Sequence, residues 1–474
     1  MKKAVTILLF ALFLITLTGL ARYIFLHQTG IPAMSAVKND ASLAGMYRKT
    51  ADIDLGKVEV YNYQRMGFTH GFLQFSPNSR YLALGTEQGD ILFMNVDGKT
   101  LWKRSIGLGK ISALTFSPDG SKLLVGDTSQ QGSLICFDTA TGNELWRYAS
   151  ASELEPDIRQ KIYPGIVYIT TDEQGFIYAV GQRYKKNSDG SNEYRDRIYK
   201  LDENNGNKVA MFPPDHDMDA WVSWVGVDRQ GRRLVFGTGN WDTGKTCRYD
   251  DNVYCLDDKL NQPLWSVFID PVTPYQRTTM RSSPDISADG SYIAGIANDG
   301  RCFLYDGGGR ELWRRTLSQP RQIGGVYINA TGMFVRIVGG YVVLTTGNTY
   351  NRANWQLPTP VDHPARNTIF VFDLQGNLMY KHSTGGMVEE MSINDGRIVL
   401  AVGRNVRTKD PSVHGIQILS LEDGRLLDSM PTAGPCIGEA SSADGRYVAG
   451  IEAPIQLDDG QIIGSYRLYI WEKK

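Results

Sequence analysis

The chain repeats one short pattern along most of its length. Two segments show it best, residues 75–105 (FSPNSRYLALGTEQGDILFMNVDGKTLWKRS) and residues 116–148 (FSPDGSKLLVGDTSQQGSLICFDTATGNELWRY). Each contains an apolar run, a polar turn, a β-rich run, a glycine-containing turn, an aromatic run that ends in Asp, a second turn and then Leu-Trp. The first of these turns recurs at 76–79, 117–120, 172–175, 228–231, 287–290, 329–332, 394–396 and 442–445.

The spacing of these turns indicates the fold. Their last residues lie 41 to 64 residues apart, and a period near 40 residues with insertions is typical of a β-propeller built from four-stranded blades. The eight turns predict an all-β protein with eight blades; seven blades is the alternative if the sixth and seventh repeats merge. Because enzymes and binding platforms share this scaffold, the fold alone leaves the function open.

The two ends of the repeat array predict how the ring closes. The last repeat supplies three strand candidates, 439–444, 446–453 and 465–474, and the chain stops before a fourth. An alternating segment, KVEVYNYQ (57–64), precedes the first repeat. We expect this N-terminal strand to complete the last blade as its outer strand, which would remove the free edges of the ring.

The N-terminus is apolar and sets the expected location. Lys2 and Lys3 precede an apolar stretch that reaches Leu20, with Arg22 the one charge before Leu26. About 20 apolar residues can span a bilayer as a helix, so residues 1–26 are predicted to be an uncleaved membrane anchor; a signal peptide cut after Ala21 and a secreted product is the alternative. The lysines favour a cytoplasmic N-terminus, which places the remaining chain outside the cytoplasm, at the cell surface or in the periplasm. Residues 27–50 are interpreted as a linker and residues 51–474 as the propeller.

Charge and cysteine content exclude several classes of protein. Fifty basic residues against 51 acidic ones give a net charge of -1, so no excess of positive charge favours nucleic acid. The five cysteines form no pair or cluster with zinc-site spacing. We interpret them as small buried apolar residues, with a disulfide between Cys247 and Cys255 as the alternative in an oxidising compartment.

The outer strands carry tryptophan at matching repeat positions. Trp102, Trp146, Trp265 and Trp313 follow Asp- and Gly-bearing turns, and a large ring at this position can wedge between blades. The pattern Asp-x-x-x-Gly-x-x-x-Trp at 138–146 resembles the tryptophan-docking repeat of the pyrroloquinoline-quinone (PQQ)-like propeller superfamily, and the FSPDG turn also resembles WD-type propellers. That superfamily includes quinoprotein alcohol dehydrogenases and a noncatalytic scaffold of outer-membrane protein assembly.

The resemblance implies one cofactor site, and the spacing of three aspartates suggests a separate metal site. The stretch GTGNW (237–241) is similar to the quinoprotein segment whose Asn helps to hold calcium, so Asn240 is the candidate ligand for a calcium–PQQ site. The adjacent Cys-Cys pair that stacks on the quinone in many such enzymes is missing. Separately, Asp215, Asp217 and Asp219 have the spacing of a calcium loop, although Ala220 replaces the glycine that such a loop needs.

The longest connections are expected on one face of the ring. In a four-stranded blade the connection between the second and third strands shares a face with the connection to the next blade. The irregular segments 182–197, 238–252, 346–367, 403–414 and 453–464 all fall at the former position. Binding residues usually collect on long loops carried by a rigid scaffold. These five segments are therefore the candidate partner-binding inserts.

Candidate partner-binding residues lie in the inserts and on the inner strands. Aromatic anchors are Trp241, Tyr350 and Trp355, because interface hot spots favour Trp, Tyr and Arg. Arg281, Glu389 and Glu439 are predicted to recognise charged groups of a ligand or peptide at the channel mouth. Other expected channel residues are His70, Lys110, Tyr168, Trp224 and Glu390.

The sequence as a whole favours a membrane-tethered, extracytoplasmic propeller that binds a protein or peptide through its inserts, without a cofactor. A PQQ- or metal-dependent oxidoreductase and a carbohydrate- or small-ligand-binding module are the alternatives. No catalytic residue is nominated, because no known nucleophile, zinc-protease or phosphate-loop motif occurs.

Overall fold

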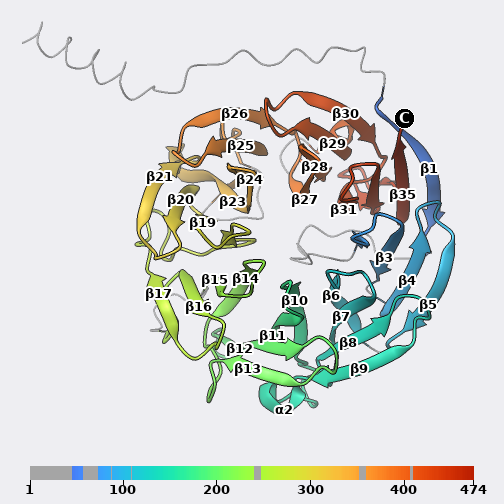
Figure 1. The fold of residues 1–474 in the computed structure, drawn as a ribbon. Helices are drawn as coiled ribbons and strands as arrows, with labels where there is room; N and C mark the ends of the chain where they lie inside the picture. The colour runs from blue at the N-terminus through green and yellow to red at the C-terminus, as the bar shows by residue number, and fades with distance from the viewer. Residues whose placement is uncertain are drawn as a thin grey trace, which may run out of the picture. The chain divides into compact units, whose positions relative to one another are not determined.

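A computed structural model shows a ring of antiparallel sheets (Figure 1). It describes residues 45–56, 73–86, 88–107, 109–239, 247–351, 359–405 and 409–474. The chain divides into residues 1–44 and a second compact unit, 45–474, to which all described residues belong. Among these, no helix is long and apolar enough to cross a membrane. The predicted anchor, residues 1–26, lies outside the described residues.

Consecutive strands form four-stranded blades that run outward from the centre of the ring. The first four blades are β2 (Leu73–Phe75), β3 (Tyr81–Gly85), β4 (Asp90–Asn95) and β5 (Thr100–Ser105); β6 (Lys110–Phe116), β7 (Lys122–Thr128), β8 (Ser133–Asp138) and β9 (Glu144–Ala149); β10 (Gly165–Thr171), β11 (Phe176–Lys186), β12 (Asn192–Asp202) and β13 (Lys208–Phe212); and β14 (Trp221–Val227), β15 (Arg233–Gly239), β16 (Val253–Asp257) and β17 (Pro263–Val267).

The blades of the C-terminal half follow the same order, with an added strand in one of them. They are β18 (Asp285–Ile286), β19 (Tyr292–Ile296), β20 (Arg301–Asp306) and β21 (Glu311–Thr316); β23 (Val326–Val338), β24 (Tyr341–Asn351), β25 (Thr368–Asp373) and β26 (Leu378–Ser383), with β22 (Arg321–Ile323) added beside β23; β27 (Val388–Asn394), β28 (Arg397–Val402), β29 (Gly415–Ser420) and β30 (Leu426–Pro431); and β31 (Cys436–Ser441), β32 (Tyr447–Glu452), β35 (Arg467–Lys473) and β1 (Tyr47–Asp54). The remaining described elements are α2 (Ala151–Leu154), η1 (Pro411–Val413) and the pair β33 (Ile455–Gln456) and β34 (Ile462–Ile463).

The middle strands of a blade are more buried than its outer strand, and their sequences are more apolar. The middle strands are continuous apolar runs, as in β7 and β8, where nearly every residue is buried. Such strands pack against neighbouring blades on both faces, so alternation is lost. The outer strands are mostly exposed; in β21 only Trp313 is buried. One large side chain therefore supplies most of the apolar contact of an outer strand.

The outer aromatic residues dock onto the next blade. Nε1 of Trp102 donates to the carbonyl oxygen of Thr139 at 2.9 Å, and Nε1 of Trp313 donates to that of Leu374 at 3.1 Å. A Cβ on Gly376 would lie 2.8 Å from Cγ of Trp313, so glycine is what lets the ring approach. The same contact to a glycine-bearing turn is made by Trp146 with Gly206, Trp265 with Gly309 and Tyr380 with Gly424. The prediction that these tryptophans wedge between blades is confirmed.

The ring closes through an N-terminal strand, as predicted, but through a different segment. β1 pairs antiparallel with β35, from Tyr47 with Lys473 to Asp54 with Arg467. The expected strand, 57–64, lies outside the described residues, and the expected linker 27–50 overlaps β1. The sequence of β1, YRKTADID, has few apolar residues because only its inner side packs, where Ala51 and Ile53 lie against Gly98 of the first blade.

Two further expectations are corrected by the strand register. The segment NATG (329–332) was expected to be a turn, but it lies inside β23, which turns into β24 at Gly339 and Gly340. Adjacent glycines tolerate positive φ, so the GG pair was the better turn signal. The insert 182–197 was expected to be irregular. It is the regular hairpin of β11 and β12, paired from Phe176 with Asp202 to Lys186 with Asn192.

Substitutions at two glycines test the contribution of docking to stability. Gly376 (φ +80) and Gly340 (φ +87) both adopt positive φ, but no atom lies within 4 Å of a Cβ at Gly340. Alanine at either site should cost about 1–2 kcal/mol of backbone strain. Gly376→Ala should cost about 1–3 kcal/mol more, because the new methyl group displaces Trp313. Denaturant unfolding of the full-length chain measures both, and equal losses would show that the docked ring contributes little.

Candidate functional site

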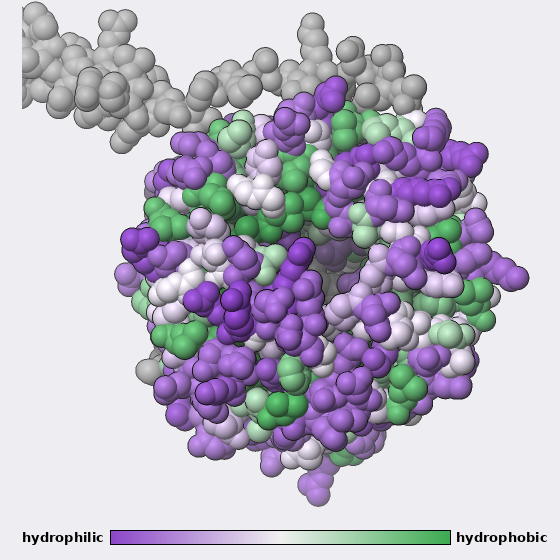
Figure 2. All heavy atoms as spheres, in the orientation of Figure 1, coloured by the Kyte–Doolittle hydropathy of each residue, from purple (hydrophilic) through white to green (hydrophobic). Residues whose placement is uncertain are grey.

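A cavity of about 540 Å³ lies on the axis of the ring, between the inner strands. It is lined by β2, β6, β10, β14, β18, β23, β27 and β31, and by the first turns of three blades at Ser76–Pro77, Ser117–Pro118 and Ala443. The cavity therefore lies at the end of the channel that bears these short turns, opposite the inserts. A hollow is visible at the centre of the ring in Figure 2.

One side of the cavity is aromatic and carries the cavity's guanidinium group. The rings of Tyr168 and Trp224 meet edge to face, with centroids 5.4 Å apart. Arg336 places its Cζ 4.6 Å from the centre of the Trp224 ring, a cation–π contact. The backbone N–H of Ile337 donates to Oδ2 of Asp285 at 2.8 Å, and burial raises the pKa of Asp285 although Arg336 opposes the shift.

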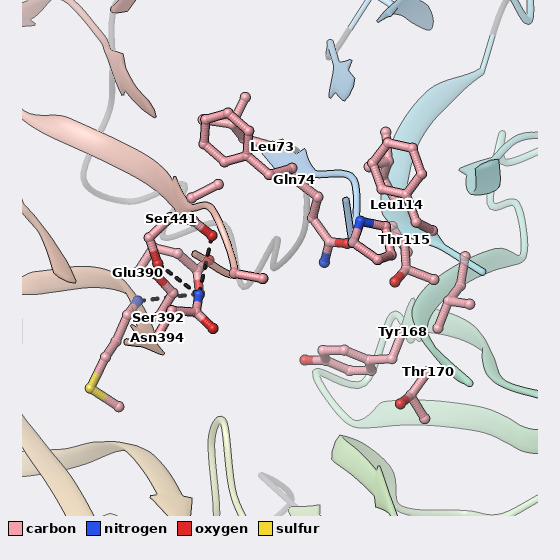
Figure 3. Close-up of a pocket in the computed structure, with 18 of the residues that line it drawn as sticks. Leu73, Gln74, Leu114, Thr115, Tyr168, Thr170, Glu390, Ser392, Asn394 and Ser441 are labelled. Atoms are coloured by element: carbon pink, nitrogen blue, oxygen red, sulfur yellow. Dashed lines mark hydrogen bonds between the residues drawn. The ribbon is translucent and has the colours of Figure 1, made fainter. Parts of the chain in front are cut away.

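The opposite side of the cavity holds a chain of hydrogen bonds between β27 and β31 (Figure 3). Nδ2 of Asn394 donates to the Oγ of Ser441 at 2.8 Å and to its carbonyl oxygen at 3.1 Å. The two hydroxyl oxygens of Ser441 and Ser392 are 2.7 Å apart, and Ser392 donates to Oε2 of Glu439 at 2.9 Å. Each hydroxyl has one proton, so the Ser441 hydroxyl donates to Ser392, and the chain of donors ends at Glu439.

Glu439 is a buried carboxyl group of the cavity whose pKa is raised. Its side chain lies on β31 in a residue that is 4% exposed, and its Oε1 has no hydrogen-bond partner among the described residues. Burial first, and the nearby carboxylate of Glu390 second, raise the pKa of Glu439 well above its ordinary value. The hydrogen bond from Ser392 and the charge of Arg336 lower it, by less. A buried carboxyl group with an unsatisfied oxygen is costly unless it is protonated or meets a ligand.

Other predicted partner-binding residues gather at the insert-bearing end of the channel. Burial raises the pKa of Tyr350, the charges of Arg281 and Arg404 lower it, and that of Glu389 raises it again, so these groups lie within electrostatic reach of one another. Arg404 was not predicted. Arg281 and Tyr350 are buried, at 5% and 7% exposure, and Glu389 is partly buried. This cluster therefore belongs to the base of the inserts more than to their outer surface.

The predicted residues thus divide between the two ends of the channel. Tyr168, Trp224, Glu390 and Glu439 line the cavity, whereas Lys110 is exposed and outside it. Trp241, Trp355, Asn240 and His70 lie outside the described residues, and their roles stay predictions.

The three predicted calcium ligands have separate partners. Oδ1 of Asp217 accepts from Nε of Arg197 at 2.5 Å, and Oδ1 of Asp215 lies 2.5 Å from Nδ1 of His216. Asp219 accepts from the backbone N–H groups of Arg248 and Tyr249. Across the part of the chain that the structure describes, no group of three His, Cys, Asp or Glu side chains is placed to hold a metal ion. Calcium binding by the three aspartates stays a prediction.

The predicted PQQ site stays a prediction, because its candidate ligand Asn240 lies outside the described residues. All five cysteines are free and buried, which agrees with their interpretation as small apolar residues, and burial raises the pKa of Cys136 and Cys302 to about 12. They lie in different blades or strands, so they form no stacking pair. The face of Trp224 in the cavity is already covered by Arg336.

Sequence reasoning missed the polar chain that holds Glu439. Ser392, Asn394 and Ser441 occur on two inner strands that are 47 or 49 residues apart in sequence. The sequence shows serine and asparagine at alternating positions of β27, which is a polar pattern on an inner strand. Their convergence depends on the lateral packing of two blades, which no local pattern specifies.

The raised pKa of Glu439 gives a testable pH dependence. The folded protein holds this proton more tightly than the unfolded chain, so protonated Glu439 stabilises the fold below pH of about 4.5, and this contribution is lost as the pH rises through the higher folded pKa. Glutamine cannot ionise. The melting temperature of wild type should therefore fall relative to Glu439→Gln as the pH rises above about 4.5. Glu173→Gln, an exposed site on the turn-bearing face, should track wild type; parallel curves for all three proteins would contradict the assignment.

Comparison with known proteins identifies the family. The PQQ_2 family model, described as outer membrane protein assembly factor BamB, matches residues 87–425, more than half of the chain. Among curated proteins, abnormal embryogenesis protein 30 of Caenorhabditis elegans is 30% identical over 116 residues, which cover 22% of this chain and 11% of that protein. The chain therefore spans about a tenth of the length of that relative.

Solved structures show the same fold at low sequence identity. The crystal structure of BamB from Moraxella catarrhalis has a TM-score of 0.54 and 13% identity, and covers 90% of this chain and 99% of that one. The C-terminal WD40 domain of Sif2 has a TM-score of 0.55 and 10% identity, with 90% and 98% coverage. Both show that the chain has a β-propeller fold. Since the family model matches most of the repeat array, this protein belongs to the family described as outer membrane protein assembly factor BamB.

Proposed function

We propose that this protein is an extracytoplasmic, membrane-tethered, eight-bladed propeller that binds a protein or peptide partner through the inserts on one face of the ring. The observation that carries the proposal is the common position of those inserts. They connect the second and third strands of their blades, so antiparallel pairing directs all of them to one face. A rigid ring that presents several long segments on one side is a typical binding platform.

The best-described insert is a rigid hairpin. The outer halves of β11 and β12 continue the pairing of their blade without a register shift. Tyr184 is 48% exposed near its end, and its ring lies 5.5 Å from that of Tyr194. Arg195 forms an ion pair with Glu155 at 2.8 Å, which ties the hairpin to the neighbouring connection. A pre-ordered arm with an exposed tyrosine loses little conformational entropy on binding.

The base of a second insert, 346–367, is hydrogen-bonded to the adjacent blade. Nδ2 of Asn348 donates to the carbonyl oxygen of Arg404 at 3.3 Å, and the backbone N–H of Met387 donates to the same oxygen at 3.0 Å. Nδ2 of Asn367 donates to Oδ1 of Asn348 at 3.0 Å. A polar cluster lies where two inserts begin. It contains Asn348, Asn367, the carbonyl group of Arg404, Arg281, Tyr350 and Glu389. Their proposed role is to position the inserts, and Glu439 lies in the cavity at the other end.

The family supports a partner in the cell envelope. Its description names an assembly factor of outer membrane proteins, and the nearly balanced charge of this chain gives no reason to expect nucleic acid. Residues 1–26 would hold the ring at the membrane. An oxidoreductase and a carbohydrate-binding module remain the alternatives, and no described residue favours either one.

Site-specific photocrosslinking tests which face binds. A benzophenone amino acid replaces Tyr184 or Asp458 on the insert face, and Gln174 or Asp289 on the turns of the opposite face. In intact cells, both insert positions should yield one and the same adduct, identified by mass spectrometry, and the turn positions should not. Trp241→Ala or Trp355→Ala should lower the yield of the adduct about 30-fold, as expected when a hot-spot residue contributes about 2 kcal/mol to the binding free energy.

A matched control keeps the crosslinking result specific. Leu264→Ala removes an apolar side chain that is 54% exposed on the outer strand β17, away from the inserts. It should leave the adduct unchanged. Equal adducts from both faces, or different proteins at the two insert positions, would overturn the proposed binding face.

Membrane tethering is tested by the fate of the N-terminus. If residues 1–26 form an anchor, full-length protein should stay in the membrane pellet after carbonate extraction, and its intact mass should include the N-terminal segment. Deleting residues 2–26 should leave the protein in the soluble fraction of the cytoplasm, because both anchor and export signal are lost. A mature N-terminus at Arg22 in a soluble fraction outside the cytoplasm would instead establish a cleaved signal peptide.

A further inference from the structure

The connection from β17 to β18, residues 268–284, presents apolar side chains to solvent. The connection to the next blade shares a face with the inserts, so Phe268, directly after β17, lies at the insert-bearing edge of the rim (Figure 1). Phe268 is 49% exposed, and it is the one exposed phenylalanine among the described residues. Pro271 and Val272 follow it and are also exposed. We call Phe268, Pro271 and Val272 the apolar patch.

Hydrogen bonds to Asn252 hold both ends of this connection in place. The backbone N–H of Asn252 donates to the carbonyl oxygen of Val267, and its Oδ1 accepts from the backbone N–H of Ile269, each at 2.8 Å. Its Nδ2 donates to the carbonyl oxygen of Thr278, also at 2.8 Å. Asn252 is 4% exposed, so water competes little for these bonds. The backbone that carries the apolar patch is therefore fixed before a partner binds.

An ordered and exposed aromatic ring is typical of a binding anchor. Aromatic side chains are enriched in the cores of protein interfaces, because one ring buries a large apolar area. When the backbone of the ring is already ordered, binding costs less conformational entropy. The fixed position of Phe268 thus suits contact with an apolar group of a partner.

Two arginines contact this connection, and each has a carboxylate partner. Nη1 of Arg277 lies 2.5 Å from Oδ1 of Asp250, and Nη2 of Arg301 lies 2.6 Å from Oδ2 of the buried Asp299. The same Arg301 nitrogen donates to the carbonyl oxygen of Asp270 at 2.6 Å, which places this ion pair beside the connection. These ion pairs add no net charge to the surroundings of the apolar patch.

Asp251 and Asp270 make the surroundings of the apolar patch negative. Asp270 lies within the connection and is exposed, and Oδ2 of Asp251 accepts from the hydroxyl group of Ser266. Within the part of the chain that the structure describes, neither carboxylate has an ion-pair partner. A positively charged group of a partner would be attracted here. An anionic membrane surface would be repelled, so the charge favours a protein segment over a lipid surface.

We propose that this connection binds a segment of the protein partner in which an apolar side chain lies next to a lysine or arginine. The apolar side chain packs on Phe268 and Val272, and the cation pairs with Asp270. The inference rests on the proposed function, because it names the chemistry of the partner that the insert face binds.

Photocrosslinking from the apolar patch tests the chemistry of the partner. A benzophenone amino acid that replaces Val272 leaves Phe268 intact. In intact cells, the full-length chain should capture through this position the same protein that position 184 captures. The captured peptide, sequenced by mass spectrometry, should contain an apolar residue next to Lys or Arg. Capture of a second copy of this chain, of a lipid or of a peptide rich in Asp and Glu would overturn the proposal, and so would the absence of an adduct.

Serine substitutions measure the contribution of the ring, with the adduct formed at position 184 as the readout. Phe268→Ser should lower the yield of this adduct about 10- to 30-fold. Leu264→Ser is the matched control, because Leu264 is 54% exposed on the same side of β17, about 13 Å further toward the turn-bearing face. It should leave the yield unchanged. Equal yields from the two variants would overturn the role of Phe268 as an anchor.

Charge reversal tests the predicted ion pair. Asp270→Lys should lower the yield of the same adduct about 5- to 10-fold, because it places like charges opposite each other. Replacing the captured lysine or arginine of the partner with Glu should restore the yield with Asp270→Lys. Glu173→Lys makes the same change of charge on the turn-bearing face and should have no effect. An unchanged yield with Asp270→Lys, or an equal loss with Glu173→Lys, would overturn the pairing.

Failure of this inference can be told apart from failure of the proposed function. If positions 184 and 458 capture no protein in the otherwise unchanged chain, the proposed partner face is wrong and the inference is wrong with it. If both positions capture the partner, but Phe268→Ser and Asp270→Lys leave the yield unchanged, only the further inference is wrong.

Discussion

The ring depends on the contact between an outer-strand aromatic residue and a glycine turn of the next blade. The outer strands are largely exposed, so most of their apolar contact passes through one ring, as Trp313 shows against Gly376. The indole N–H also satisfies a turn carbonyl that would otherwise face apolar surface. The contact links successive blades, and the pairing of β1 with β35 builds the N-terminal strand into the C-terminal blade, which closes the ring.

This construction leaves the two ends of the channel free to differ. At one end the connections are short turns packed against their neighbours, and a polar cavity opens between the inner strands. At the other end the connections are long, and they start beside a polar cluster that includes Tyr350 and Arg404. The first arrangement buries Glu439 and places a directed chain of donors beside it. The second suits a large partner, because exposed and pre-ordered arms such as the β11–β12 hairpin can cover more surface.

Predictions from the sequence were correct where hydrogen bonds between nearby residues determine the local structure. The SPDG turn at 117–120 has a serine and an aspartate that hydrogen-bond within the turn and a glycine at positive φ, so local sequence is sufficient. Predictions were wrong where pairing with another strand, and not the local turn sequence, determines the structure. NATG resembles a turn, yet residues 329–332 continue β23 because Asn329, Ala330 and Gly332 pair with β24. β1 was placed ten residues too late, because an outer strand that packs on one side needs few apolar residues.

The repeat period, the buried cysteines and the docking tryptophans follow from the sequence alone, because each arises from the packing needs of one blade and recurs with it. The sequence also indicated that Tyr168, Trp224 and the glutamates belong to inner strands, since strand order within a repeat is local. Only the tertiary structure brought Ser392, Ser441 and Glu439 together and set them apart from Tyr350. The reason is physical: the register between neighbouring blades depends on packing around the whole ring, and burial of Glu439 by that packing raises its pKa.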